Sequence, residues 1–162
     1  MLRKLFQTDR DYLLTIVRVV LGVVFLAHGA QKVTGWFGGY GFSATMGGME
    51  HMGIPTPLAF LAIATEFAGG LGLIGGLLSR VAAFGIAVEM VVAITKFHSP
   101  NGFFMNWMGN QKGEGFEYHL LALALLIVVL LRGSGALSLD RLIAAGFERD
   151  EAPSRRQSPA AA

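Results

Sequence analysis

Four apolar segments constrain the fold of this chain more than any other feature of its sequence. They cover about residues 12–30, 57–78, 81–97 and 116–131. A helix needs about 20 apolar residues to cross the hydrocarbon core of a bilayer, and the last two segments, which are nearer 17, could span if their ends extend into the loops. The chain is 15% charged, whereas a soluble domain carries about 25% charged residues. We therefore predict an all-α integral membrane protein, a four-helix transmembrane bundle.

Lys and Arg residues flank these segments unevenly, and the asymmetry predicts the orientation of the chain. Nine lie on the side of the two termini and the turn at 79–80, against three, Lys32, Lys96 and Lys112, on the side of the loops near 31–56 and 98–115. Cytoplasmic loops carry an excess of Lys and Arg. Both termini of this multi-pass chain are therefore predicted to be cytoplasmic. These residues form no basic patch, so we expect no nucleic-acid partner.

The segments that follow the first apolar run complete the predicted domain organisation. Arg18 within that run, and His28 near its end, argue against its removal as a signal peptide. Residues 1–148 are predicted to form one membrane domain, whose residues 138–147 form an interfacial helix capped by Ser138. Residues 149–162 (RDEAPSRRQSPAAA) are rich in polar and charged residues and predict a disordered tail.

Ionisable residues inside the predicted spans are the first candidates for function. Each costs about 2.5–3.5 kcal/mol near the centre of a membrane helix, so it is expected to face inward and find a partner. Counting depth at about 1.5 Å per residue predicts a middle layer of Arg18, Glu66 and Glu89. Its formal charge is −1, so one carboxyl is expected to hold a proton. Such a layer suits proton or quinone chemistry, or it is a static Arg–Glu pair that holds helices together.

A second group of polar residues is predicted at the outer end of the bundle. It comprises His28 and Lys32 in the first segment, Lys96 and His98 at the end of the third, and Glu114, Glu117 and His119 at the start of the fourth. Imidazole, ammonium and carboxyl groups would thus converge from different helices, which makes this end the best candidate site. Side chains that reach toward the membrane surface explain Lys32, Lys96 and Glu114 equally simply.

The two predicted outer loops are rich in aromatic residues and methionine. Trp36 and Trp107, with neighbouring Phe and Tyr residues, would form an interfacial belt or a lid over a flat ring. Thioether and imidazole groups suit Cu(I), and the loops contain Met46, Met49, His51, Met52, Met105 and Met108. A short apolar helix face explains the first methionines as well, so we assign no metal ligand. Because the chain has no cysteine, disulfide chemistry, Fe–S clusters and thiolate zinc sites are excluded.

The order and spacing of several short motifs resemble the DoxX family of small four-span membrane proteins over about residues 12–140. The resemblance rests on Arg18 with Gly22, His28-Gly29 with Lys32 and Gly35, Gly53-Ile54-Pro55, Glu66, Arg80, Glu117, Gly135 and Ser138-Leu139-Asp140. It implies a four-helix bundle in the cytoplasmic membrane of a bacterium. Some family members are described as quinone-linked subunits of thiosulfate-oxidising complexes, and others as membrane oxidoreductases linked to quinone or oxidative stress.

Three functions are consistent with these residues. In the first, the chain is a quinone-linked oxidoreductase or the membrane subunit of a redox complex, with Glu66, Glu117, His28 and His119 as catalytic residues. The quinone would then contact Arg18, Lys32, Glu89, Lys96, His98, Trp36 and Trp107. In the second, the chain is a non-enzymatic scaffold that binds a partner subunit or a second copy of itself. In the third, the Met and His loops handle copper.

Overall fold

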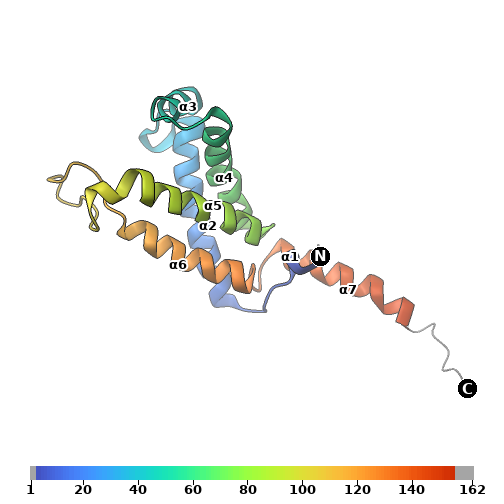
Figure 1. The fold of residues 1–162 in the computed structure, drawn as a ribbon. Coiled ribbons are helices and arrows are strands. Elements are labelled where there is room, and N and C mark those ends of the chain that lie inside the picture. The colour runs from blue at the N-terminus through green and yellow to red at the C-terminus, as the bar shows by residue number, and fades with distance from the viewer. Residues whose placement is uncertain (1–2, 156–162) are drawn as a thin grey trace, which may run out of the picture.

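The computed structural model of the protein describes residues 3–155, with side chains placed for residues 4–147. Within this range every regular element is a helix, and there is no strand. The longer helices are α2 (Tyr12–Thr34), α4 (Thr56–Gly75), α5 (Ser79–Ala93), α6 (Glu117–Arg132) and α7 (Leu139–Arg155). The shorter ones are α1 (Arg3–Phe6), α3 (Phe42–His51), two 3-10 turns, η1 (Trp36–Gly38) and η3 (Ser99–Asn101), and the π-helical segment η2 (Ile94–His98) (Figure 1).

Three helices of the described chain are long and apolar enough to cross a membrane. They are Tyr12–Thr34 (mean hydropathy 2.1), Thr56–Gly75 (1.7) and Ser79–Asn101 (1.6), the last formed by α5, η2 and η3 together. This confirms the all-helical class and the first three predicted spans. Helix α6 has 16 residues, a length of about 24 Å. The fourth span and the cytoplasmic position of the termini stay predictions.

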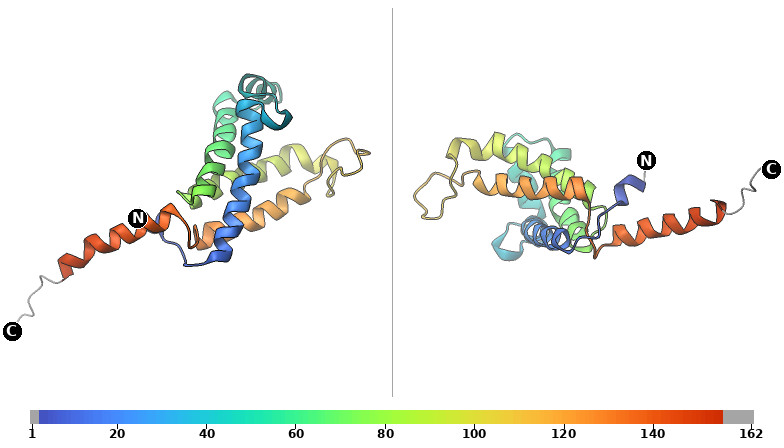
Figure 2. Two further views of the ribbon diagram at one scale, coloured as in Figure 1. Left: turned by 180° about the vertical axis from the view of Figure 1, so that it is seen from behind. Right: turned by 90° about the horizontal axis from the view of Figure 1, so that it is seen from below.

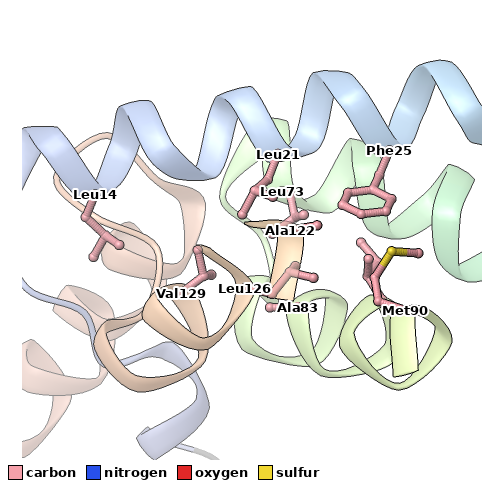
Figure 3. Close-up of a cluster of buried hydrophobic side chains, with 10 residues drawn as sticks. Leu14, Leu21, Phe25, Leu73, Ala83, Met90, Ala122, Leu126 and Val129 are labelled. Atoms are coloured by element: carbon pink, nitrogen blue, oxygen red, sulfur yellow. The ribbon is translucent and has the colours of Figure 1, made fainter. Parts of the chain in front are cut away.

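The four apolar helices form two antiparallel pairs. Helix α2 packs along α4, and α5 packs along α6. In every view the α5–α6 pair runs across the α2–α4 pair rather than alongside it (Figures 1 and 2). The core lies where the pairs cross: Leu21 and Phe25 of α2 face Leu73 of α4, Ala83 and Met90 of α5, and Ala122 and Leu126 of α6 (Figure 3). The structure is therefore two crossed hairpins with one shared core.

Glycines bring the backbones of α2 and α4 into contact. A Cβ atom added to Gly29 of α2 would lie 2.5 Å from the backbone of Phe67, and one added to Gly70 of α4 would lie 2.5 Å from the backbone of Leu26. No real Cβ tolerates such distances, so both positions require glycine for this packing. Because Gly29 and Phe67 are near neighbours of Lys32 and Glu66 in sequence, this close approach also brings Lys32 and Glu66 together.

A buried carboxylate fixes the end of the molecule where the chain passes from α4 to α5. Asp140 accepts hydrogen bonds from the backbone N–H groups of Leu78 (2.7 Å) and Ser79 (3.1 Å), and from the hydroxyl of Ser134. Asp140 thus caps the N-terminus of α5, as an N-cap side chain does, although it lies about 60 residues further along the chain. This contact also fixes the start of α7.

Helix α7 covers more of the chain than the predicted interfacial helix at 138–147. It begins at Leu139 and ends at Arg155, so a helix continues into residues 149–155, where the sequence predicted a disordered tail. Its first residues carry Leu139 and Leu142, which are exposed. Location at a membrane interface stays a prediction for this helix, and residues 156–162 of the predicted tail lie outside the described range.

Candidate functional site

An ion pair joins the two helices of the first hairpin. The Lys32 ammonium group of α2 donates a hydrogen bond to Oε2 of Glu66 in α4. The Glu66 side chain is only 6% exposed and that of Lys32 is 23% exposed. Both groups lie on helices that can span a membrane, where water cannot solvate them and each needs a partner within the protein. This pair is the centre of the candidate site.

A second carboxyl group, Glu89 of α5, lies beside the pair. It is within hydrogen-bonding reach of the Glu66 carboxyl, and it is also close enough to Lys32 to feel its charge. Its Oε2 atom is buried and has no hydrogen-bond partner among the described residues. Two carboxyl groups therefore share one ammonium group, and Oε2 of Glu89 remains buried without a hydrogen-bond donor among the described residues.

Imidazole and phenol rings complete the site from α2, η2 and α6. The ring of His28 is 6.2 Å from that of Tyr118, and the rings of His98 and His119 are 4.1 Å apart. The charge of Glu66 acts on both His28 and Tyr118, which places these rings near the carboxyl pair. We call the seven side chains together the polar cluster: His28, Lys32, Glu66, Glu89, His98, Tyr118 and His119.

Two further buried atoms of the polar cluster resemble Glu89 Oε2. The Tyr118 hydroxyl and the His119 Nδ1 atom are both buried, and neither has a hydrogen-bond partner within residues 4–147. Buried polar groups are nearly always hydrogen-bonded, to protein, to ordered water or to a ligand. Three such atoms in one cluster leave hydrogen-bonding capacity there for ordered water or a polar ligand.

His98 reaches the polar cluster because the third span ends in a π-helical segment, η2. Such segments are rare and occur often at functional sites. The Nδ1–H group of His98 donates to the backbone carbonyl of Glu114 at 2.9 Å. That hydrogen bond fixes the ring and leaves Nε2 as its second polar atom.

Arg18 does not contact Glu66 or Glu89, so the prediction that these three residues form one layer is wrong. Its guanidinium group is 1% exposed and donates to four backbone carbonyls, those of Leu73, Ile74 (2.8 Å), Ser134 (2.7 Å) and Leu137 (2.6 Å). In the antiparallel register of α2 against α4, Gly29 lies against Phe67, whereas Arg18 lies against Leu73 and Ile74. Lys32, which is 14 residues or roughly 21 Å further along α2, is the partner of Glu66 instead.

The other predicted site residues lie outside the polar cluster. Glu117 accepts hydrogen bonds from the backbone N–H of Met105 (2.9 Å) and from Nε1 of Trp107 (3.3 Å), and so holds the loop before α6. Lys96 is exposed, as are Trp36 (66%) and Trp107 (83%). Trp36 is in η1 after α2, and Trp107 is in the loop before α6; these segments lie at the tips of different helix pairs (Figures 1 and 2).

The loops that suggested copper are also separate. Met46 and Met49 are in α3, whereas Met105 and Met108 are in the loop before α6. These two segments lie at the tips of different helix pairs (Figure 1). Among the described residues, no group of three or more His, Asp or Glu side chains could hold a metal ion. The structure therefore brings no shared ligand set together from the two loops.

Sequence reasoning missed Tyr118 and Asp140. Tyr118 stands between Glu117 and His119, where attention falls on the charged neighbours, although a tyrosine at the start of an apolar segment is a polar group that needs a partner when buried. Asp140 was part of a sequence motif, but no residue near it in sequence indicated a binding partner. Its role depends on the backbone N–H groups of Leu78 and Ser79, 62 and 61 residues away.

Comparison with known proteins decides the family. The model of the DoxX family matches residues 13–99, a range that contains α2, α4 and α5 and the Lys32–Glu66–Glu89 arrangement. The chain belongs to the DoxX family. Helix α6, with Tyr118 and His119, lies beyond the matched range. No solved structure matches this DoxX protein at a significant level.

Similar curated proteins occur in several bacteria, and two of them are named as membrane proteins. The chain is 30% identical to the "Inner membrane protein YqjF" of Escherichia coli, over 79% of this chain and 89% of the other. It is 30% identical to the "Putative oxidoreductase CatD" of Bacillus subtilis (81% and 87%) and 34% identical to an uncharacterized membrane protein of Mycobacterium tuberculosis (77% of each). With its apolar helices, the DoxX protein is thus a multi-pass protein of the bacterial inner membrane.

The position of Arg18 leads to a prediction that separates a structural role from a role in binding a ligand. Replacing Arg18 with Lys keeps the charge but cannot supply donors to four carbonyls. We expect Arg18→Lys to lower the free energy of unfolding by about 2–4 kcal/mol, because buried hydrogen bonds to a charged group are lost. Equilibrium unfolding in mixed detergent micelles measures this change. The control is Arg10→Lys at an exposed position, and equal stability of the two variants would contradict the assignment.

Proposed function

We propose that this DoxX protein is a membrane component of a quinone-linked oxidoreductase and that the ring of a quinone binds at the polar cluster. The observation that carries the proposal is the set of three buried polar atoms without a partner in the described chain, Glu89 Oε2, Tyr118 OH and His119 Nδ1. They come from α5 and α6, opposite the Lys32–Glu66 pair of α2 and α4. A ligand with several polar atoms on a flat apolar body would satisfy them.

The residue types of the polar cluster fit such a ring. A quinone carries two carbonyl oxygens, which accept hydrogen bonds, and its reduced form carries two hydroxyl groups, which donate them. The Tyr118 hydroxyl and a His119 N–H can donate, whereas Glu89 Oε2 can accept. When bound, a quinone supplies two-electron, two-proton redox chemistry. The side chains of the cluster are thus suited to bind either form of the ring and to orient it.

The carboxyl pair supports a role in proton exchange. Glu66 and Glu89 face a single ammonium group, Lys32, so the three groups sum to one negative charge when all are ionised. In surroundings that solvate charge poorly, one proton held between the two carboxyls removes that excess. A carboxyl that holds such a proton beside His28 and Tyr118 can pass it to, or take it from, a bound molecule.

The electrons in this proposal belong to a partner protein. The chain has no cysteine, so it cannot hold a thiolate-bound Fe–S cluster, and we assign electron exchange to a redox subunit that associates with it. The name of the Bacillus subtilis relative, an oxidoreductase, is in keeping with this role. In this account the DoxX protein binds the ring and exchanges its protons.

A binding experiment tests the proposal. The protein is purified from the membrane in mild detergent, and retained quinone is extracted and identified by mass spectrometry. A short-chain quinone is then titrated onto the stripped protein, with tryptophan fluorescence or calorimetry as the readout. We expect Tyr118→Phe and Glu89→Gln each to weaken binding at least fivefold, because each removes a group that the ring needs.

Matched substitutions control for general effects on the protein. Tyr40→Phe and Glu50→Gln make the same chemical changes, Tyr40 at a fully exposed position and Glu50 in the loop helix α3, outside the polar cluster. They should leave quinone binding unchanged. If no quinone is retained or bound, or if the polar-cluster variants bind it as the controls do, the proposal fails. Effects of these variants on stability alone would instead favour the scaffold function.

We further propose that α6 completes a set of four spans with both termini in the cytoplasm. Helix α6 has no Asp, Glu, Lys or Arg between Glu117 and Arg132. It packs along α5, which forms most of the candidate span Ser79–Asn101. At 16 residues it is short, and local thinning of the bilayer accommodates such a helix at modest cost. The excess of Lys and Arg at the termini supports the orientation.

Because the chain has no cysteine, single introduced cysteines report its topology directly. We expect Lys112→Cys, in the loop before α6, to react in intact cells with a maleimide that does not cross membranes. Lys4→Cys, in α1, should react only after the cells are opened. Both positions are exposed, so accessibility within the protein does not limit labelling. Labelling of Lys4→Cys in intact cells would contradict the orientation.

A further inference from the structure

A basic cavity lies at the opposite end of the molecule from the polar cluster. It is open to the surface, has a volume of about 560 Å³, and is lined by residues 7–9, Arg80 of α5, the end of α6 and the first turns of α7. Three arginines line it, Arg80, Arg132 and Arg141, with one acidic residue, Asp9. Its lining therefore carries a formal charge of +2. Neither the proposed quinone site nor the family assignment accounts for this cavity.

Each of the three guanidinium groups uses some of its N–H donors in hydrogen bonds within the protein. Arg80 donates to the backbone carbonyls of Leu130 (2.6 Å) and Gln7 (3.0 Å). Arg132 donates from Nε to Asp9 (2.5 Å). In the same way, Arg141 donates to the carbonyl of Ala136 at 3.0 Å. These contacts hold the three groups around one space.

Donors remain after these contacts are counted. A guanidinium group has five N–H donors, and the contacts of Arg132 and Arg141 described above use one each. The Nε atom of Arg80 is buried and has no partner within the described residues. Several N–H donors with a net positive charge form a site for an anion that has several oxygen atoms, above all a phosphate group.

An apolar cavity adjoins the basic one. It has a volume of about 520 Å³, shares Arg141 and Ala145 with the basic cavity, and is otherwise lined mainly by small and apolar residues, among them Leu137, Leu139 and Leu142. Leu137 and Leu142 are 65% and 70% exposed. A polar cavity for an anion thus stands next to an apolar one. A free phosphate ion would bind only in the basic cavity. A phospholipid would bind in both, with its phosphate group in the basic cavity and an acyl chain in the apolar one.

We propose that these two cavities together bind one anionic phospholipid, with its phosphate group among Arg80, Arg132 and Arg141 and its acyl chain along Leu139 and Leu142. Basic pockets beside membrane helices bind anionic headgroups, because guanidinium groups attract them and the adjacent hydrocarbon retains the chains. The start of α7 lies between the cavities, since Arg141 and Ala145 line both. The lipid then joins α7 to α5 and α6.

Native mass spectrometry of the detergent-solubilised full chain tests this inference. The probe is phosphatidylglycerol, titrated beside phosphatidylcholine, which carries the same phosphate group but no net charge. We expect one phosphatidylglycerol to bind at least tenfold more tightly than phosphatidylcholine. The double variant Arg132→Gln/Arg141→Gln should weaken that binding at least fivefold. The matched control, Lys4→Gln/Arg10→Gln, removes the same charge from exposed positions outside the cavity and should bind as the native chain does.

A second variant keeps the test valid if the double variant folds poorly. Ala145→Phe leaves every charge in place but fills space that both cavities share, so it too should weaken binding of phosphatidylglycerol several-fold. Equal weakening by the Lys4→Gln/Arg10→Gln control would overturn the inference, because the attraction would then be general. Displacement of the lipid by inorganic phosphate at similar concentration would overturn it as well, since the site would then be one for a free anion.

Discussion

The ion pair between Lys32 and Glu66 is the interaction on which the rest of the structure depends. Hydrocarbon offers no water to either group, so an unpaired Lys32 or Glu66 would make both α2 and α4 costly to insert. The pair forms because Gly29 and Gly70 let the two backbones touch, and this contact brings the ammonium group to Glu66. The ion pair of this hairpin therefore depends on the close helix packing that its glycines allow.

The two ends of the molecule satisfy buried charge in different ways. At one end, Arg18 and Asp140 bind backbone groups, four carbonyls and two N–H groups respectively. These contacts satisfy both side chains and fix helix ends. At the other end, Glu66 and Glu89 share Lys32, and polar atoms of Glu89, Tyr118 and His119 remain without a partner in the described chain. The first arrangement is structural, and the second leaves room for chemistry.

The sequence predicts the helices well and the contacts between them only in part. Apolar length predicted the spans of α2, α4 and α5 because that property is local. Convergence of His28, Lys32, His98 and His119 followed from their positions at helix ends. The partner of Glu66 could not be predicted from depth, because it depends on the register of α2 against α4. That register brings Gly29 to Phe67 and Lys32 to Glu66. Tyr118 and Asp140 act through contacts that no local pattern contains.

A double-mutant cycle on Lys32 and Glu66 tests the central claim most directly. The free energy of unfolding is measured in mixed detergent micelles for Lys32→Met, Glu66→Gln and the double variant. If the ion pair organises the hairpin, each single variant is strongly destabilised. Lys32→Met leaves the buried Glu66 without its cation, and Glu66→Gln removes the carboxylate to which Lys32 donates. The double variant should then recover about 1–3 kcal/mol relative to the sum of the single changes. Effects that simply add would contradict the claim.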